Sequence, residues 1–380
     1  MTDLVRQEIA AAATTMVVKV GTRVLASEDG RLSEWRIAAL AEELHLVKAS
    51  GRKVVLVSSG AVGAGMGRLG LRSRPTDLAQ LQAVAAVGQS LLMEAYDHAL
   101  RALGRVGAQV LLTAEDLEHR TRYLNARNTL MTLLDDFDAV PIINENDTVS
   151  VEELQTTFGD NDRLAAIVTN LIRAPLLVLL SDVEGLYDGD PRSPQSRVIP
   201  TVNQLDASIF DLVRDSLTGL SKGGMASKLR AARMATAAGE NTIIASGRTP
   251  GVLSKIVAGE PVGTLFLAQG PVVTARKRWF GLTVQPRGHL VLDAGARRAV
   301  EEQGRSLLPI GILEAVGHFR KGDVVALRDA DGAEFARGLS NYSAEEVQKI
   351  KGLKTAQIAD VLGYRPYDEV IHRNNLLVTS

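Results

Sequence analysis

Short runs of consecutive apolar residues alternate along the chain with longer stretches in which apolar residues recur at helical spacing. The apolar runs predict strands and the longer stretches predict helices. The predicted strands are 16–20, 53–58, 108–112, 139–143, 176–180, 242–245 and 264–267. The predicted helices lie near 33–50, 76–103, 121–136, 161–173, 225–239 and 250–259. Apolar strands separated by helices are typical of a parallel sheet covered on both faces, so we predict an α/β fold: a three-layer αβα sandwich with a mainly parallel sheet.

The pattern changes near residue 270. The segment QGPVVTARKRW carries a glycine, a proline and a basic cluster, and shorter apolar segments follow it. We therefore predict a first domain at 1–270, a linker at 271–285 and a small β-rich domain at 286–380. Within the small domain, RDADGAEFARG predicts a hairpin with Asp331-Gly332 at its turn.

Composition excludes several classes of function. The formal net charge of −1 gives no whole-chain argument for binding nucleic acid or an anionic membrane. No apolar run approaches the roughly 18 residues that predict a membrane-spanning helix, and the N-terminal segment lacks the pattern of a secretion signal. The chain has no cysteine, which excludes disulfides, thiolate metal sites and cysteine nucleophiles. We therefore expect a cytoplasmic protein that does not bind membranes.

The glycine-rich stretch VVLVSSGAVGAGMGRLG contains a match to the dinucleotide pattern G-x-G-x-x-G at residues 65–70. A dinucleotide fold needs that motif directly after a strand and at the start of a helix, with an acidic residue about 20 positions later. Here GAVGA separates the strand from the motif, and a polar segment containing proline follows it. The context argues against a nicotinamide cofactor. We interpret the glycines as a tight turn, or as backbone that approaches a bound anion.

Polar residues follow four of the predicted strands. They are Gly21-Thr22, Ser58-Ser59-Gly60, the segment Asn144 to Thr148, and Ser181-Asp182. In an open α/β sheet, ligands bind outside the carboxyl ends of the strands. We therefore predict that the functional site lies at this edge of the sheet.

Two lysines and one acidic segment carry the chemistry. Lys19 interrupts a buried run, so it either reaches solvent from an edge strand or meets a phosphate. Lys228 lies in the first turn of a predicted helix, where a cation opposes the helix dipole, so it is either solvated or compensated by a bound phosphate. The segment GDNDR places Asp160 or Asn161 as the N-cap of another helix.

These residues favour phosphoryl transfer, and none of the six histidines lies in the loops that carry them. Phosphoryl transfer needs positive charge and alignment more than covalent chemistry from the protein. The phosphates of a donor nucleotide would lie between Lys19 and Lys228. The acidic residues would bind a cationic group of the acceptor, or magnesium through water.

Several motifs resemble the bacterial glutamate 5-kinases of the amino-acid kinase family. They are VVKVGTRVL, VVLVSSGAVGAG, AAVGQSLLMEAY, RYLNARNTLMTLL, VPIINENDTVS, FGDNDRLAAIV, LLVLLSDVEGLYDGDPR, GGMASKLRAA and SLLPIGI. The similarity runs from about residue 15 to 375, and LDAGARRAV and EFARGLSNYSAEEV resemble the PUA domain that follows many such kinases. The resemblance implies the amino-acid kinase fold and the phosphorylation of the side-chain carboxylate of L-glutamate by ATP with Mg²⁺. The product would be L-glutamyl 5-phosphate, in the first step of proline biosynthesis.

The resemblance also implies a role for each matching residue. The catalytic residues would be Lys19 and Lys228, which hold the transferring phosphoryl group, and Asp162, which orients them. The residues that contact glutamate would be Ser59, Gly60, Asp147 and Asn161. The residues that bind ATP would be Lys19, Ser181, Asp182, Lys222, Gly223, Gly224, Met225, Ala226, Ser227 and Lys228.

The chain departs from the family pattern at two places. The family more often has Thr at the position of Ser181, and commonly Gly-Thr-Gly-Gly at residues 221–224, where this chain has SKGG. Serine keeps the hydroxyl group, so the first change is mild. Lys222 adds a charge beside the expected nucleotide. An attacking carboxylate is already ionised at neutral pH, so the reaction class needs no general base.

Two alternative functions remain at this stage. One is an amino-acid kinase that acts on acetylglutamate, aspartate or carbamate, against which NENDTVS and the PUA-like segment argue. The other is RNA binding by the PUA-like domain through Arg276-Lys277-Arg278 beside Trp279-Phe280, a cluster we interpret instead as a linker packed on the first domain. The family further implies proline as a feedback inhibitor, glutamyl phosphate reductase as a partner, and a homo-oligomer, either a dimer or a tetramer.

Overall fold

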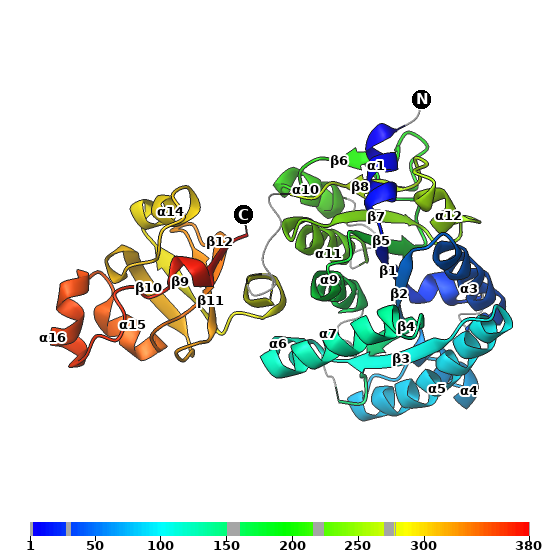
Figure 1. The fold of residues 1–380 in the computed structure, drawn as a ribbon, viewed down its shortest axis with the longest axis horizontal. Helices are drawn as coiled ribbons and strands as arrows, with labels where there is room; N and C mark the ends of the chain where they lie inside the picture. Colours follow the sequence, from blue (N-terminus) through cyan, green and yellow to red (C-terminus); the bar gives the residue numbers. More distant parts are fainter. Residues whose placement is uncertain are drawn as a thin grey trace. The chain divides into compact units, whose positions relative to one another are not determined.

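The computed structural model describes residues 3–27, 32–149, 160–215, 224–269, 277 and 279–379. The chain divides into two compact units, Met1–Val272 and Val273–Ser380 (Figure 1). Each unit has its own sheet and its own hydrophobic core. The bounds predicted for the two domains and for the linker between them remain predictions.

In the described part of the first unit, eight strands form one sheet in the order β3-β4-β2-β1-β5-β7-β8-β6. The pairs among β3, β4, β2, β1, β5 and β7 are all parallel. The strands are β1 (Thr15–Val20), β2 (Lys53–Ser58), β3 (Gly107–Leu112), β4 (Val140–Glu145), β5 (Leu176–Ser181), β6 (Thr201–Val202), β7 (Asn241–Ser246) and β8 (Thr264–Phe266). Strand β6, which has only two residues, was not predicted from the sequence, and neither was the antiparallel pairing of β8 with β7.

Helices cover both faces of this sheet. One face packs against α3, α5 and α12, whose apolar residues join the strands in a single core (Figure 1). The other face carries α7, α9 and α11, which contact the sheet and one another. The predicted three-layer αβα fold is therefore confirmed. The described helices of this unit are α1 (Leu4–Ala12), α2 (Thr22–Leu25), α3 (Glu34–Ala49), α4 (Ala61–Leu69), α5 (Leu78–Ala102), α6 (Ala114–Glu118), α7 (Arg120–Asp135), α9 (Asp160–Ile172), α10 (Ala207–Asp215), α11 (Gly224–Ala237) and α12 (Val252–Val257).

The glycine-rich stretch forms helix α4, which the sequence analysis did not predict. Gly60 precedes the helix in the left-handed conformation at φ 118°, which favours glycine at this position. A Cβ on Gly65 would lie 1.9 Å from the carbonyl oxygen of Val84, and one on Gly88 would lie 1.7 Å from that of Ala61. Glycine at these two positions lets α4 and α5 pack backbone against backbone.

The second unit contains a five-stranded sheet in the order β10-β9-β11-β12-β13. The predicted hairpin is present: β11 pairs antiparallel with β12, and Gly332 at the turn has φ 86°. Residues Trp279–Thr283 form η1, a π-helix that packs on β12 and β13 of the same unit. The remaining described elements are β9 (Gly288–Leu292), β10 (Ile312–Gly317), β11 (Val324–Arg328), β12 (Glu334–Leu339), β13 (Leu376–Val378), α14 (Ala294–Glu301), α15 (Ala344–Ile350), α16 (Ile358–Leu362), η2 (Pro309–Gly311), η3 (Thr355–Gln357) and η4 (Arg373–Asn375).

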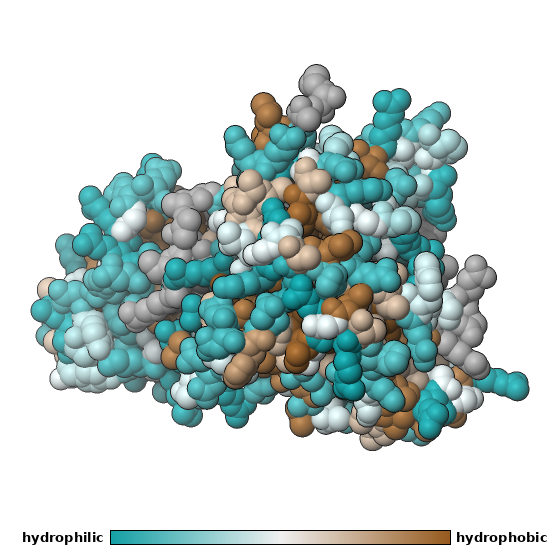
Figure 2. Space-filling model, turned by 45° about the vertical axis from the view of Figure 1, so that its right-hand side comes forward, coloured by the Kyte–Doolittle hydropathy of each residue, from teal (hydrophilic) through white to brown (hydrophobic). Residues whose placement is uncertain are grey.

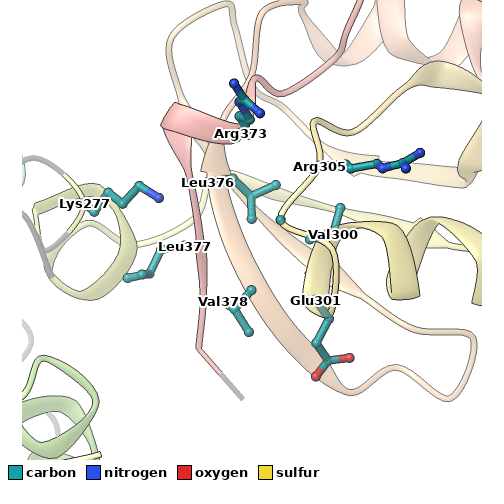
Figure 3. Close-up of a pocket in the computed structure, with 9 residues that line it drawn as sticks. Lys277, Val300, Glu301, Arg305, Arg373, Leu376, Leu377 and Val378 are labelled. Atoms are coloured by element: carbon teal, nitrogen blue, oxygen red, sulfur yellow. The ribbon is translucent and has the colours of Figure 1, made fainter. Parts of the chain in front are cut away.

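A small cavity of about 160 Å³ lies in the second unit between α14 and β13. Val300, Leu376 and Val378 give it an apolar lining. Figure 3 shows that the charged ends of Arg305, Arg373 and Glu301 point in different directions and do not converge on one centre. In the basic cluster considered for RNA binding, Lys277 lines this cavity, whereas Arg276 and Arg278 lie outside the described residues.

The surface offers no extended apolar face in the view of Figure 2, where brown residues are interspersed among hydrophilic ones. Among the described helices, none combines the length and the apolar character needed to cross a bilayer.

Candidate active site

The sheet brings the polar strand ends of the first unit together at one edge. Strand β1 lies between β2 and β5, with Lys19 opposite Val57 on one side and Leu179 on the other. Lys19 is therefore on a central strand, and the edge-strand alternative is wrong. The Lys19 side chain is only 7% exposed, so its charge depends on a buried partner.

Two helices begin at the same edge of the sheet. Helix α9 leads into β5 and α11 leads into β7, so each helix must start where the carboxyl ends of the parallel strands lie. Asn161 and Asp162 occupy the start of α9, and Lys228 lies one turn into α11. The crossover connections of the fold thus bring these three residues to the end of β1.

Lys19, Asp162 and Lys228 form a buried triad. The Nζ atom of Lys19 lies 2.7 Å from one carboxylate oxygen of Asp162, and the Nζ atom of Lys228 lies 3.3 Å from the other. Lys228 also donates a hydrogen bond to the carbonyl oxygen of Gly224 at 3.3 Å. The carboxylate is only 2% exposed. The alternative in which Lys228 is a solvated surface lysine is therefore wrong.

The triad carries one net positive charge in a buried place. Burial alone would raise the pKa of Asp162, but Lys19 and Lys228 hold that pKa below its ordinary value. Burial lowers the pKa of Lys228, an effect that the charge of Lys19 adds to and that of Asp162 opposes. Two cations held side by side by one anion suit a ligand that brings several negative charges.

Asn161 links the triad to the ends of β2 and β4. Its Nδ2 atom donates to the Ser59 hydroxyl at 3.0 Å and to the side-chain oxygen of Asn144 at 3.1 Å. Gln89 on α5 in turn accepts a hydrogen bond of 2.7 Å from Asn144. Asn144 and Gln89 were not among the predicted site residues. Asn144 lies in the NENDT segment that follows a predicted strand. That position could have indicated a place in the site.

The other residues predicted to contact glutamate lie at the same strand ends. Gly60 follows Ser59 and is the N-cap of α4. Asp147 follows β4 and is buried. Ser59 and Gly60 come after β2, which is the neighbour of both β1 and β4. The sheet thus gathers the residues predicted to contact glutamate along one stretch of its edge.

The predicted nucleotide segments lie after β5 and at the start of α11. Ser181 is buried at the end of β5 and donates to the carboxylate of Asp182 at 3.2 Å. Gly224, Met225, Ala226 and Ser227 form the first turn of α11, ahead of Lys228. Lys222 and Gly223 lie outside the described residues. Arg23, which pairs with Asp182 at 3.1 Å, was not predicted. Its place in the sequence shortly after Lys19 could have indicated that it lies near the site.

No group of three or more His, Asp or Glu residues that could hold a metal ion occurs within the described part of the chain. Asp162 is engaged by two lysines and Asp182 by Arg23. This arrangement is compatible with Mg²⁺ bound mainly through phosphate oxygens and water.

Comparison of the chain with known proteins identifies its family. The model of the amino acid kinase family matches residues 14–246, and the model of the PUA domain matches residues 288–362. The chain therefore belongs to the amino acid kinase family and carries a PUA domain. Relatives called glutamate 5-kinase match it over nearly its full length.

Three such relatives illustrate the similarity. That of Rhodopirellula baltica is 49% identical over 98% of this chain and 96% of its own length. That of Myxococcus xanthus is 48% identical over 96% of each chain. That of Syntrophotalea carbinolica is 46% identical over 98% of this chain and 99% of its own.

Proposed function

We propose that the chain transfers the γ-phosphoryl group of ATP to the side-chain carboxylate of L-glutamate, giving L-glutamyl 5-phosphate and ADP. The observation that carries this proposal is the triad, in which Lys19 and Lys228 share the carboxylate of Asp162. The relatives called glutamate 5-kinase support the choice of glutamate as the acceptor.

In the proposed mechanism, Lys19 and Lys228 contact the oxygens of the transferring phosphoryl group. Negative charge spreads over those oxygens in the transition state, so two fixed ammonium groups lower its energy. Asp162 contacts neither substrate and acts as a positioning residue. Because it is buried and bonded to both lysines, the cations are already in place before the nucleotide binds.

The acceptor needs no general base, since the carboxylate of glutamate is ionised at neutral pH. The remaining task is to align an acceptor oxygen with the γ-phosphorus. We assign the amino-acid group of glutamate to Asn161 and Asp147, and the approach of its side chain to Ser59 and Gly60. The hydrogen bond from Asn161 to Ser59 supports a shared role for these two residues.

We assign ATP to Ser181, Asp182 and the segment from Lys222 to Lys228. Mg²⁺ would neutralise phosphate charge, held by the nucleotide and water. Proline as an inhibitor, glutamyl phosphate reductase as a partner, a dimeric or tetrameric assembly and a cytoplasmic location complete the proposal, each on the basis of the resemblance to the family or of the sequence. A role of the PUA domain in binding RNA is not part of it.

The test is an assay of the purified protein with ATP and Mg²⁺ and with glutamate, acetylglutamate or aspartate in turn. Hydroxylamine traps the acyl phosphate, and ADP is measured in parallel. We expect hydroxamate only with glutamate. Hydroxamate with acetylglutamate or aspartate in its place would contradict the assigned acceptor, and ADP formation that no acceptor stimulates would contradict the kinase activity itself.

A further inference from the structure

Arg23 forms an ion pair at the edge of the sheet that carries the triad. It lies in α2, the short helix directly after β1, and Asp182 directly follows β5, the neighbour of β1. The Nη1 atom of Arg23 lies 3.1 Å from a carboxylate oxygen of Asp182. The side chain of Arg23 is 52% exposed and that of Asp182 is 30% exposed, so the pair faces solvent on one side.

The backbone of Arg23 is held from a third strand. Arg248, in the loop after β7, donates from Nη2 to the carbonyl oxygen of Arg23 at 3.4 Å. The neighbouring Gly247 packs so closely on Val24 that a Cβ would lie 2.6 Å from a Val24 methyl carbon. The ends of β1, β5 and β7 are thereby tied together around the Arg23–Asp182 pair.

The Arg23–Asp182 pair lies close enough to the triad for its charges to interact with those of the triad. Asp182 is close enough to Lys228 for its charge to raise the pKa of that lysine, against the larger effect of burial. Burial opposes the ionisation of Asp182, yet hydrogen bonding and charge from Arg23 help to keep its pKa below the ordinary value. Lys19, Lys228 and Arg23 thus supply three positive charges at this edge of the sheet, and Asp162 and Asp182 supply two negative charges.

An exposed ion pair contributes little to the stability of a fold. A carboxylate beside a phosphate site, however, repels the polyanion that must bind there. We propose that Arg23 is a positioning residue for the nucleotide, which it serves by fixing the carboxylate of Asp182 and cancelling its charge beside the phosphates. The inference rests on the proposed function only in taking the nucleotide to bind next to Lys228.

The first test measures nucleotide binding directly, with a non-hydrolysable ATP analogue and Mg²⁺ in an equilibrium titration that needs no acceptor. Arg23→Gln should raise the dissociation constant of the analogue about fivefold to tenfold, the effect of one uncompensated charge near the phosphates. KM for ATP should rise in parallel, with kcat and KM for glutamate unchanged. Arg23→Lys keeps the charge and should restore most of the affinity.

The second test separates a role through Asp182 from direct contact with phosphate. In an Asp182→Asn background the charge that Arg23 cancels is absent, so adding Arg23→Gln should change the dissociation constant less than twofold. A full effect of Arg23→Gln in that background would overturn the proposal, and so would no effect in the wild-type background.

Arg101→Gln is the matched control. Arg101 is also exposed and paired with an aspartate, Asp97, but it lies in the last turn of α5, shortly before the amino end of β3. It should leave the titration unchanged. A fall in melting temperature with Arg23→Gln, accompanied by equal losses in all kinetic constants, would show a merely structural role and overturn the proposal. Failure of wild-type protein to phosphorylate glutamate while the titrations behave as described would contradict only the proposed function.

Discussion

Lys19 and Lys228 bind the two oxygens of a single carboxylate, that of Asp162, at 2.7 Å and 3.3 Å. One lysine comes from a central strand, and the other lies one turn into α11, a helix that packs against α9. The pairing holds two like charges close together in a buried place, which is costly without the anion between them.

Removing the ammonium group of Lys228 should impair the chemical step. We expect Lys228→Met to lower kcat by about 100-fold or more, the usual cost of losing one fixed group that stabilises transition-state charge. Steady-state kinetics at saturating ATP and glutamate measure the effect. Lys255→Met, in the last turn of α12, is the control and should retain wild-type kcat. A Lys228→Met enzyme with near-normal kcat would contradict the assigned role.

Removing the shared anion should destabilise the fold in a pH-dependent way. Asp162→Asn leaves two buried cations without a counter-charge, at a cost of about 3–5 kcal/mol in the free energy of unfolding. The folded-state pKa of Asp162 is lowered, so its stabilising contribution is present above the ordinary carboxyl pKa of about 3.9 and is lost as the pH falls through the folded value. The gap between wild type and variant should therefore be widest near neutral pH and shrink below about pH 4.

Urea unfolding of both proteins at pH 7, 4 and 3 measures this gap. Asp97→Asn removes the partner of an exposed arginine on α5 and should show almost no gap at any of these pH values. A gap for Asp162→Asn that stays constant down to pH 3 would show that this carboxyl has the same pKa in the folded and unfolded protein, and would contradict its stabilisation by the two lysines.

Removing the side-chain amide of Asn161, which links the ends of β2 and β4, should selectively weaken the binding of glutamate. Asn161→Ala loses the donor to Ser59 and Asn144, and with it the proposed contact to glutamate. We expect KM for glutamate to rise about 10-fold to 100-fold, the range for a hydrogen bond to a charged group, while the dissociation constant of the ATP analogue stays the same. Asn203→Ala, at an exposed position, is the control. Equal losses for both substrates would contradict a specific role in holding the acceptor.

Filling the contact between α4 and α5 should destabilise the first unit. Alanine normally favours a helix over glycine by about 1 kcal/mol, but the Cβ of Gly88→Ala would meet the carbonyl of Ala61 at 1.7 Å. We expect a loss of about 1–3 kcal/mol or more, because the two helices must separate. KM for glutamate should rise as well, since α4 begins next to Ser59. Thermal unfolding compared with Ala83→Ser, an exposed substitution on the same helix, tests this, and an unchanged melting temperature would contradict the close packing.

Much of the fold could be predicted because burial leaves a direct record in the sequence. Strands such as β1 and β5 are covered on both faces, so nearly every residue in them is apolar, and the polar residues after them mark the edge that carries the site. Helix α4 escaped prediction because its glycines suggested a turn. One of them, Gly65, is required by the close approach of the Val84 carbonyl group in α5, which no local pattern reveals.

The sequence by itself determined the α/β class, the edge of the sheet where a ligand would bind, and the residue types suited to phosphoryl transfer. Its resemblance to known kinases indicated which of those residues act together in one site. Only the tertiary structure decided that Lys19 lies on a central strand, that Asp162 joins it to Lys228, and that Arg23 pairs with Asp182. The physical reason is that local periodicity reports which residues are buried, whereas a contact between charges depends on the order in which strands assemble into the sheet.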